Sequence, residues 1–400
     1  MINKSINLKD MKRINKAIIL NNIWKCEQLS RTELSEKIGL SPATITALVE
    51  ELLSEKMIEE LGVKESTGGR KPVMLKINSN GGYICAINVM KYCITYTIIN
   101  MDLENIYELS VRNYEEIIIQ DLFESLVTNI DAVLSVKGIA KEKLIGIGIN
   151  FCKEYEEIDK KVMLYTGLSA DRMNLDQALS FYYKKPAFIE TEINIKAIAE
   201  YHFGNAKYYD GFIYIDVSDH VNASIVYEGA IVKSPLLQNN DRLHMIIDRN
   251  GAKCSCGRRG CIDVIASLTA VLKKTAIGLN EGKDMPLFIA VNKDTKKIDI
   301  NLVIKYANEG NGFIRTIINE VSEALCICIL NFSSILNIHN FVIGGNARKI
   351  EYFPESLLNA AKKFNLTQDN KIIITMAALS EDCINMGNGA IVLNNYFKNI

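Results

Sequence analysis

The densest group of metal-binding side chains in the sequence begins at His244. Nine residues separate it from Cys254, and Cys256 and Cys261 follow closely. Three thiolates and one imidazole satisfy tetrahedral Zn²⁺, and four protein ligands leave no position for a catalytic water. The spacing therefore predicts a structural zinc site. Free thiols on a loop are one alternative, and an iron–sulfur cluster is another that the imidazole argues against. Sharp turns between the ligands are allowed by three glycines, Gly251, Gly257 and Gly260.

The composition describes a chain of packed domains. Of 400 residues, 48% are hydrophobic and 23% are charged, and the formal net charge is -1. This balance excludes fibrous and low-complexity classes, and it gives no global basic field for nucleic acid. No apolar run approaches the ~20 residues that cross a bilayer, and the N-terminus lacks a signal-peptide pattern. We expect a cytoplasmic protein without a membrane partner, whose remaining cysteines are reduced.

Two capped helices near the N-terminus have the spacing of a helix-turn-helix, preceded by a helix over 9–26. Ser30 with Glu33 forms a capping-box pattern, and Gly39 ends that helix. Ser41 with Pro42 begins the second helix. In such a motif the second helix lies in the major groove, and protein contact is the alternative use. The predicted DNA contacts of this helix are Ser41, Ala43, Thr44 and Thr46.

A β-hairpin, or wing, is expected after these helices. Residues 57–63 and 73–77 have the pattern of strands, and a polar turn joins them. The predicted DNA contacts at its tip are Ser66, Thr67, Gly68, Gly69, Arg70 and Lys71. Across residues 1–80, 13 Lys and Arg outnumber 10 Asp and Glu. We expect this excess to serve DNA binding, together with cations near the start of the chain, namely Lys4, Lys9, Lys12, Arg13 and Lys16.

From about residue 82, strands alternate with helices, which predicts two α/β lobes. The first lobe is expected to begin with a meander of three strands and to continue into a helix and a buried strand. The predicted elements include strands 83–90, 92–100, 105–113, 143–151, 211–218 and 222–232, and helices 174–184, 193–206, 311–331 and 384–397.

The chain resembles the ROK family, a group of repressors, open reading frames and sugar kinases. HMIIDRNGAKCSCGRRGC is similar to the family's zinc signature, SRTELSEKIGLSPATITALVEELL to the helix-turn-helix of its repressors, ESTGGRKPVMLKIN to their wing, and FVIGGN to a late glycine motif. The resemblance implies a two-lobed α/β actin-like, sugar-kinase fold (ribonuclease H-like) after an α+β winged helix-turn-helix domain. The implied domains are 1–80, which binds DNA, 81–195, on which helix 384–400 can pack back, and 196–383, which carries the zinc.

The resemblance also implies that the kinase chemistry has degenerated. The family's first phosphate loop, DxGGTK, lets backbone amides approach the nucleotide. Here the corresponding residues are Asn88, Val89, Met90 and Lys91. The second loop, Asp216–Ser224, contains no glycine. We therefore expect no ATP binding and assign no catalytic residue.

A sugar site is implied more weakly. Where the family has an Asn-Asp pair this chain has Thr191 and Glu192. In the family's Gly-Glu-x-Gly-His run, His244 is retained and Asp241 stands in place of the glutamate. The predicted ligand contacts are Thr191, Glu192, Asp241 and His244, of which His244 also serves the metal. An altered ligand, or none, remains an alternative.

These features together predict a DNA-binding transcriptional regulator of repressor type, acting on carbohydrate-utilisation genes. Its partners would be a double-stranded DNA operator, a small sugar effector and further copies of itself in a dimer or tetramer. A sugar that closes the cleft between the lobes would favour one arrangement of the DNA-binding domain. The alternatives are a sugar kinase with an added DNA-binding domain and a regulator that senses zinc.

Overall fold

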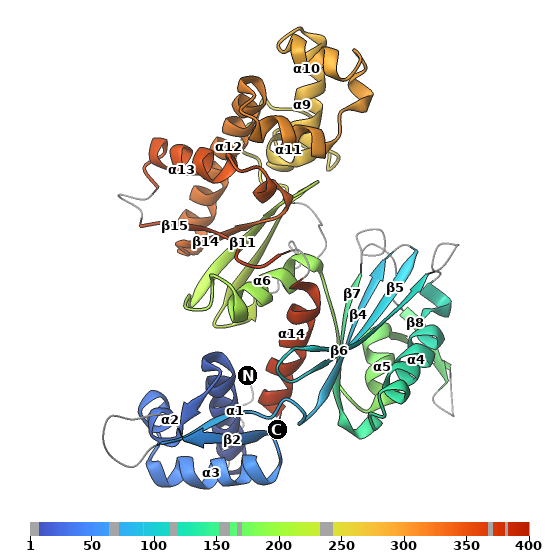
Figure 1. The fold of residues 1–400 in the computed structure, drawn as a ribbon, viewed down its shortest axis with the longest axis vertical. Coiled ribbons are helices and arrows are strands. Elements are labelled where there is room, and N and C mark those ends of the chain that lie inside the picture. The colour runs from blue at the N-terminus through green and yellow to red at the C-terminus, as the bar shows by residue number, and fades with distance from the viewer. Residues whose placement is uncertain are drawn as a thin grey trace. The chain divides into compact units, whose positions relative to one another are not determined.

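The computed structural model describes residues 8–63, 72–90, 92–112, 119–151, 161–165, 170–232, 243–366, 371–380 and 383–399. The chain divides into two compact units, Met1–Ile195 with Cys383–Ile400 and Lys196–Asp382 (Figure 1). Within the described residues, no helix has both the length and the apolar character that crossing a bilayer requires.

The N-terminal part of unit 1 is a small bundle of helices with a three-stranded sheet in the order β1-β3-β2. The three caps predicted for the helix-turn-helix are confirmed. Ser30 and Glu33 form a reciprocal capping box, Gly39 is left-handed with φ 77°, and the Ser41 hydroxyl accepts from Thr44 N–H. The elements are α1 (Leu8–Cys26), β1 (Leu29–Ser30), α2 (Arg31–Ile38), α3 (Pro42–Ser54), β2 (Ile58–Val63) and β3 (Val73–Ile77).

Lys16 fixes α1 to α3 from inside the bundle. Its Nζ lies 2.6 Å from Glu55 Oε1 and 3.2 Å from Glu51 Oε2, and the residue is only 7% exposed. Burial acts to lower the pKa of Lys16, but its hydrogen bonds and attraction to both carboxylates outweigh burial and raise the pKa. Lys12 also pairs with Glu51. The charge of Lys16 is therefore used by ion pairs inside the bundle, whereas Lys12 is 52% exposed and its expected role at DNA stays a prediction.

The rest of unit 1 is a five-stranded sheet in the order β10-β7-β4-β5-β6. β4, β5 and β6 form the predicted antiparallel meander, while β7 and β10 run parallel to β4. Helices α4 and α5 cover one face and α14 packs on the other (Figure 1). The elements are β4 (Tyr83–Met90), β5 (Cys93–Asn100), β6 (Asn105–Arg112), α4 (Ile119–Val136), β7 (Leu144–Phe151), α5 (Leu175–Tyr183), β10 (Ala187–Glu190) and α14 (Ile384–Asn399), with a separate hairpin of β8 (Lys161–Tyr165) and β9 (Ala170–Asn174).

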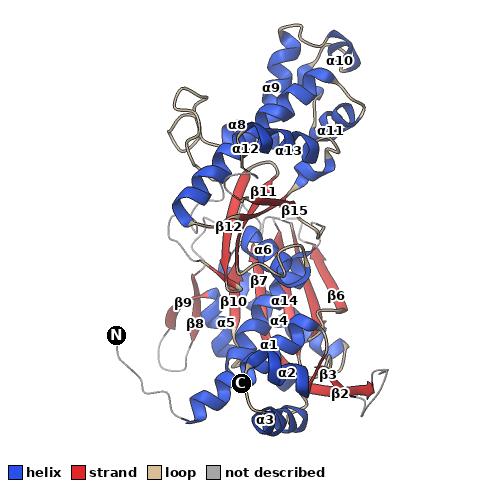
Figure 2. Cartoon of the chain, turned by 90° about the vertical axis from the view of Figure 1, so that its left-hand side faces the viewer, coloured by secondary structure: helices blue, strands red, loops and turns tan. Residues whose placement is uncertain are grey.

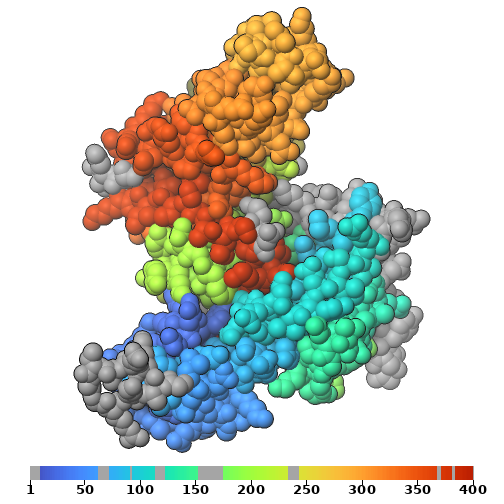
Figure 3. All heavy atoms as spheres, in the orientation of Figure 1, coloured from blue at the N-terminus to red at the C-terminus, as the bar shows by residue number. Residues whose placement is uncertain are grey.

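Unit 2 has a sheet of the same design, in the order β13-β12-β11-β14-β15. β11, β12 and β13 are antiparallel neighbours, and β14 and β15 continue parallel to β11. The helices between residues 268 and 308 lie together at one end of the unit in Figure 1, and the atoms of this part of the chain are yellow to orange in Figure 3. The elements are α6 (Glu192–Phe203, whose first turn belongs to unit 1), β11 (Gly211–Val217), β12 (Val221–Tyr227), β13 (Ala230–Ile231), α8 (Asp263–Ala266), α9 (Leu268–Asn280), α10 (Met285–Ala290), α11 (Ile300–Asn308), α12 (Gly312–Leu336), β14 (Asn340–Gly344), α13 (Phe353–Lys363) and β15 (Ile373–Met376), with short 3-10 turns at Lys141–Lys143, Thr295–Lys297 and Asn346–Lys349.

The ion pairs of Lys16 give the first prediction. Lys16→Ala should lower the free energy of unfolding of the N-terminal bundle by about 1–2 kcal/mol, because the partly solvated carboxylates of Glu51 and Glu55 lose their charge-assisted hydrogen bonds to the ammonium. Lys12→Ala is the matched control, since the Lys12 side chain is 52% exposed, and its cost should stay below about 0.5 kcal/mol. Urea unfolding of both variants decides the matter, and equal costs would contradict the assignment.

Candidate functional site

The predicted metal ligands meet at one point of unit 2. The ligand atoms of His244, Cys254, Cys256 and Cys261 all lie within 4.8 Å of one another. His244 Nδ1 is 3.5 Å from Cys254 Sγ, and the sulfurs of Cys256 and Cys261 are 3.6 Å apart. Tetrahedral Zn²⁺ with standard bond lengths separates its ligand atoms by about 3.6–3.8 Å. These two separations match that geometry, and the four ligand atoms are close enough together to hold a metal ion.

Backbone hydrogen bonds shape the loop that carries the three cysteines. Cys254 N–H donates to the Arg258 carbonyl at 2.8 Å, and Gly257 N–H donates to the Cys254 carbonyl at 3.0 Å. Gly260, at φ 66°, passes so close to the Asp248 carbonyl that a Cβ would clash with it. The predicted need for glycine is met here, because this turn brings Cys261 back beside the other sulfurs.

The electrostatics of the cluster favour a bound cation. Burial, reinforced by the neighbouring sulfurs, raises the pKa of Cys261 to about 12. The exposed Cys256 behaves in the opposite way, because a hydrogen bond from the Arg258 backbone lowers its pKa. Ionising Cys261 beside the thiolate of Cys256 is therefore unfavourable unless a positive charge offsets the repulsion between the two. A divalent cation supplies that positive charge, since coordinating thiols deprotonate.

The surface of α3 carries the DNA contacts predicted for the helix. Ser41, Ala43 and Thr46 are exposed and Thr44 is half-buried, whereas the predicted inward stripe is buried, namely Ile45, Leu48, Val49 and Leu52. The hydroxyls already have local partners: Ser41 and Thr44 share a hydrogen bond of 2.9 Å, and Thr46 donates to the Pro42 carbonyl at 2.8 Å. Their oxygens remain available mainly as acceptors. The predicted wing-tip contacts lie outside the described residues: Ser66, Thr67, Gly68, Gly69, Arg70 and Lys71.

The predicted ligand contacts are placed as follows. Thr191 and Glu192 follow β10 in unit 1, where the Thr191 carbonyl accepts from Ile195 N–H and Glu192 begins α6. His244 lies in unit 2 with the cysteines, half-buried. Asp241 lies outside the described residues. The structure thus joins Thr191 to Glu192, and His244 to the metal cluster.

Sequence reasoning missed an amide pair beside Thr191. Asn150, at the end of β7, donates from Nδ2 to Asn88 Oδ1 at 2.9 Å, and its register partner on the next strand is Glu190. Asn88 was singled out only as a replacement within a phosphate loop. The sequence could have indicated this pair, because each of two neighbouring parallel strands has an asparagine near its carboxyl end, where ligands of α/β proteins bind.

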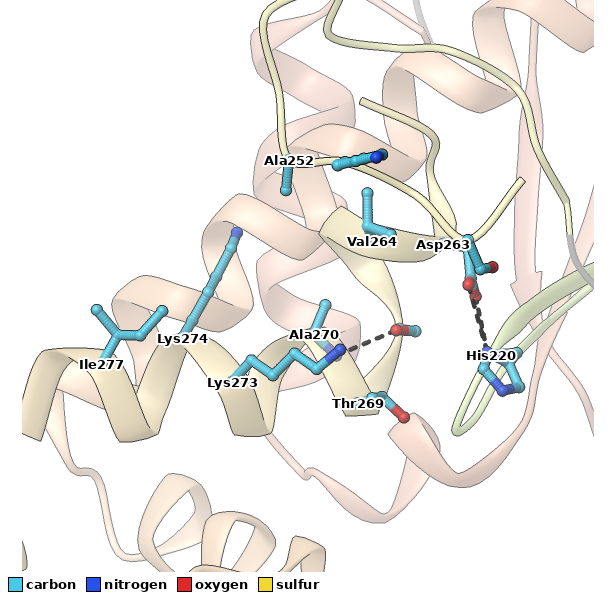
Figure 4. Close-up of a pocket in the computed structure, with 12 residues that line it drawn as sticks. His220, Ala252, Asp263, Val264, Thr269, Ala270, Lys273, Lys274 and Ile277 are labelled. Atoms are coloured by element: carbon cyan, nitrogen blue, oxygen red, sulfur yellow. Dashed lines mark hydrogen bonds and ion pairs between the residues drawn. The ribbon is translucent and has the colours of Figure 1, made fainter. Parts of the chain in front are cut away.

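The second phosphate-loop position forms the turn between β11 and β12. His220 Nδ1 and Asp263 Oδ1 lie 3.2 Å apart, and Val221 N–H donates to the same carboxylate at 3.0 Å. The Val221 amide is therefore already used by an acid. A cavity of about 350 Å³ adjoins this pair, and Figure 4 shows Lys273 and Lys274 of α9 along its wall.

Comparison with known proteins identifies the families of both parts of the chain. The model of the ROK family matches residues 86–395, and a winged helix-turn-helix DNA-binding model matches residues 15–59. The chain belongs to the ROK family. The xylose repressor of Bacillus subtilis (strain 168) is 33% identical to this ROK protein over 66% of the chain and 68% of its own length. The putative xylose repressor of Caldicellulosiruptor sp. (strain Rt8B.4) is 27% identical over 96% of each chain.

Solved structures show the fold. A ROK family transcriptional regulator described as a homologue of the E. coli MLC protein superposes with a TM-score of 0.74 at 20% identity, covering 97% of this chain and 98% of that one. A ROK hexokinase from Thermus thermophilus gives 0.60 at 16% identity, covering 77% of this chain and 97% of its own. The predictions of a two-lobed sugar-kinase-like fold behind a winged helix-turn-helix, and of a DNA-binding transcriptional regulator, are confirmed.

The cysteine cluster gives the second prediction. The purified ROK protein should carry one metal ion per chain, and Cys261→Ser should remove most of it, because an alcohol is a poor replacement for a buried thiolate ligand. Metal content is measured by plasma mass spectrometry. Cys26→Ser, in α1 and outside the cluster, is the control and should leave the metal content unchanged. Full metal occupancy in Cys261→Ser would contradict the site.

Proposed function

We propose that this ROK protein is a sugar-responsive repressor that binds operator DNA through α3 and the wing. The carrying observation is that α3 presents an exposed polar first turn while its apolar stripe is buried in the bundle. Surface helices commonly expose a polar face, but here the helix lies within residues 15–59, which match a winged helix-turn-helix DNA-binding model. A recognition helix of this kind contacts base edges with its N-terminal residues. Relatives that are named repressors support this role.

The proposal assigns a role to each domain. Residues 1–80 bind DNA, residues 81–195 with the C-terminal helix form one effector lobe, and residues 196–383 form the other. The wing tip adds contacts to phosphates or the minor groove. The protein acts as a homodimer or tetramer in the cytoplasm, because a paired operator requires two recognition helices.

The proposed effector is a neutral monosaccharide. It would contact Thr191, Glu192, Asp241 and His244, and D-xylose is the first candidate because two of the relatives are named xylose repressors. Glu192 begins a helix, where a carboxylate is favourable in any case. Its role as a ligand contact therefore rests on the family's site and needs the direct test below.

We further propose that the metal is a structural Zn²⁺ and that the protein is not a kinase. The donor set of three sulfurs and one imidazole suits Zn²⁺, and it closes the coordination sphere. Phosphoryl transfer needs charged and amide groups on the phosphates. At the two loop positions this chain instead has a neutral amide, Asn88, and an amide of Val221 that is already bonded to Asp263.

The DNA-binding face gives a third prediction. Thr46→Asp should weaken operator binding at least about 100-fold, since it places a carboxylate among the phosphates. Ser54→Asp is the matched control, because Ser54 is an exposed residue at the other end of the same helix, and it should change the dissociation constant less than about threefold. Fluorescence anisotropy with promoter DNA measures both. Equal losses would show that α3 does not enter the groove.

A fourth prediction separates the repressor from the kinase. A sugar panel headed by D-xylose should raise the unfolding midpoint in proportion to RT ln(1 + [L]/Kd), and Glu192→Gln should reduce the shift. ATP with Mg²⁺ should give no shift and no phosphorylated sugar. Sugar-dependent release of ADP by the unaltered protein would overturn the repressor-only assignment in favour of a kinase with a DNA-binding domain.

A further inference from the structure

Five side-chain polar atoms of the described residues are buried without a hydrogen-bond partner, and three of them belong to one region of unit 1. The three are Asn150 Oδ1, Thr191 Oγ1 and Asn388 Nδ2. Asn150 and Asn388 are 3% and 1% exposed. Buried polar groups normally have a partner, so three orphans in one region indicate a missing group that donates and accepts.

Two of these atoms lie at the carboxyl ends of parallel strands. Asn88, Asn150 and Glu190 are register partners on β4, β7 and β10, so their side chains share one face of the sheet. That face is turned away from α4 and α5, which cover the alternate residues. Thr191 follows Glu190 directly. The Asn88–Asn150 hydrogen bond satisfies Asn150 Nδ2 and leaves its oxygen unpaired.

The third atom comes from α14, which packs on that same face. Gly148 precedes Asn150 by two residues, and a Cβ at Gly148 would lie 3.0 Å from Asn388 Cβ. The absence of a side chain at this point of β7 therefore makes room for Asn388. The preceding residue, Gly387, contacts the backbone of Ile195. Ile195 closes the first turn of α6 by donating to Thr191. The three orphaned atoms thus come from three elements in mutual contact.

The other end of α14 holds the DNA-binding segment. Phe397 packs edge-on against Trp24 of α1, with ring centroids 5.9 Å apart at 79°. Arg13 donates to the Lys398 carbonyl at 3.0 Å, which adds a polar tie between α1 and α14. Phe397 comes nine positions after Asn388 on this helix, a rise of about 13 Å. Figures 1 and 2 both show α14 beside α1 within unit 1.

We propose that Asn150, Thr191 and Asn388 bind hydroxyl groups of a neutral polyhydroxylated ligand, and that Asn388 transmits occupancy of this site to the DNA-binding segment through α14. The proposal rests on the function proposed above and adds the residues that read the effector. An amide oxygen accepts, an amide nitrogen donates and a threonine hydroxyl does both, which together complement hydroxyl groups. None of the three is charged, and Glu190 and Glu192 nearby disfavour an anion.

Asn388→Leu is the central variant because it keeps the branched shape and the number of side-chain heavy atoms and removes the amide. Asn388→Ala is a second variant in case leucine does not fit, and Asn395→Leu is the matched control. Asn395 lies on the same helix, half-buried, and its side chain accepts from Asn399. The unfolding midpoint of each protein, the Kd for the sugar that shifts the wild type most, and operator Kd with and without that sugar are measured.

The wild type and Asn395→Leu should respond equally to the sugar. In Asn388→Leu, the sugar Kd should rise at least about tenfold, as expected for losing a hydrogen bond in a site built for hydroxyls. The ratio of operator Kd with sugar to that without should fall to within about twofold of one. The unfolding midpoint should be unchanged or higher, because an unpaired buried amide has been removed.

Sugar affinity and response equal to wild type in both Asn388 variants would overturn the proposal and leave the sugar-responsive repressor intact. Loss of sugar-free operator binding or a lowered midpoint in both variants would show a merely structural role, which also overturns it. A wild type that binds operator but responds to no sugar in the panel would instead refute the sugar effector, and the proposal with it.

Discussion

The close approach of α14 to the sheet of unit 1 is the constraint on which the arrangement of this unit depends. A run of small or compact residues, Gly387 to Ala390, is buried at the contact. Its counterpart is the bare backbone of β7 at Gly146 and Gly148. Ridges of larger side chains would hold a helix farther from the strands. Because the same helix supports α1 at its far end, the position of the DNA-binding segment follows from how α14 sits on the sheet of unit 1.

Features set by neighbouring residues were predictable from the sequence. A capping box needs only Ser30 and Glu33 three residues apart, and a tetrahedral metal set is recognisable because its ligand types are rare and crowded. The meander and the buried strand of unit 1 followed from runs of β-branched residues ending at turn signals. In each case the decisive physics acts over one turn or one strand.

Features set by distant partners were not predictable. In the sequence, Lys16 looks like any lysine that could contact DNA. Only its packing against α3 shows that its ammonium forms ion pairs with Glu51 and Glu55. Asn388 lies in an unremarkable helical segment, 238 residues from Asn150. Several helices of unit 2 lay between the predicted elements, among them α9 and α13. Tertiary packing decides such cases, and one sequence does not reveal it.

The chemistry of the strand ends explains how a phosphate-transfer fold can serve regulation. Catalysis must stabilise charge on transferring phosphates, which demands acids, metal ions and free backbone amides held within a fraction of an ångström. Regulation demands only that a ligand bind one arrangement better than another. Neutral amides such as Asn88 and Asn150 are poor at the first task, since they offer Mg²⁺ no charge, yet they bind hydroxyls well. In the function proposed above, Asn88 in place of the family's acid at the end of β4 explains a loss of turnover, while the neutral amides keep the ability to bind hydroxyls. Helix α14, which packs on β7 at Gly148 and on α1 at its other end, is the proposed link from that site to the DNA-binding segment.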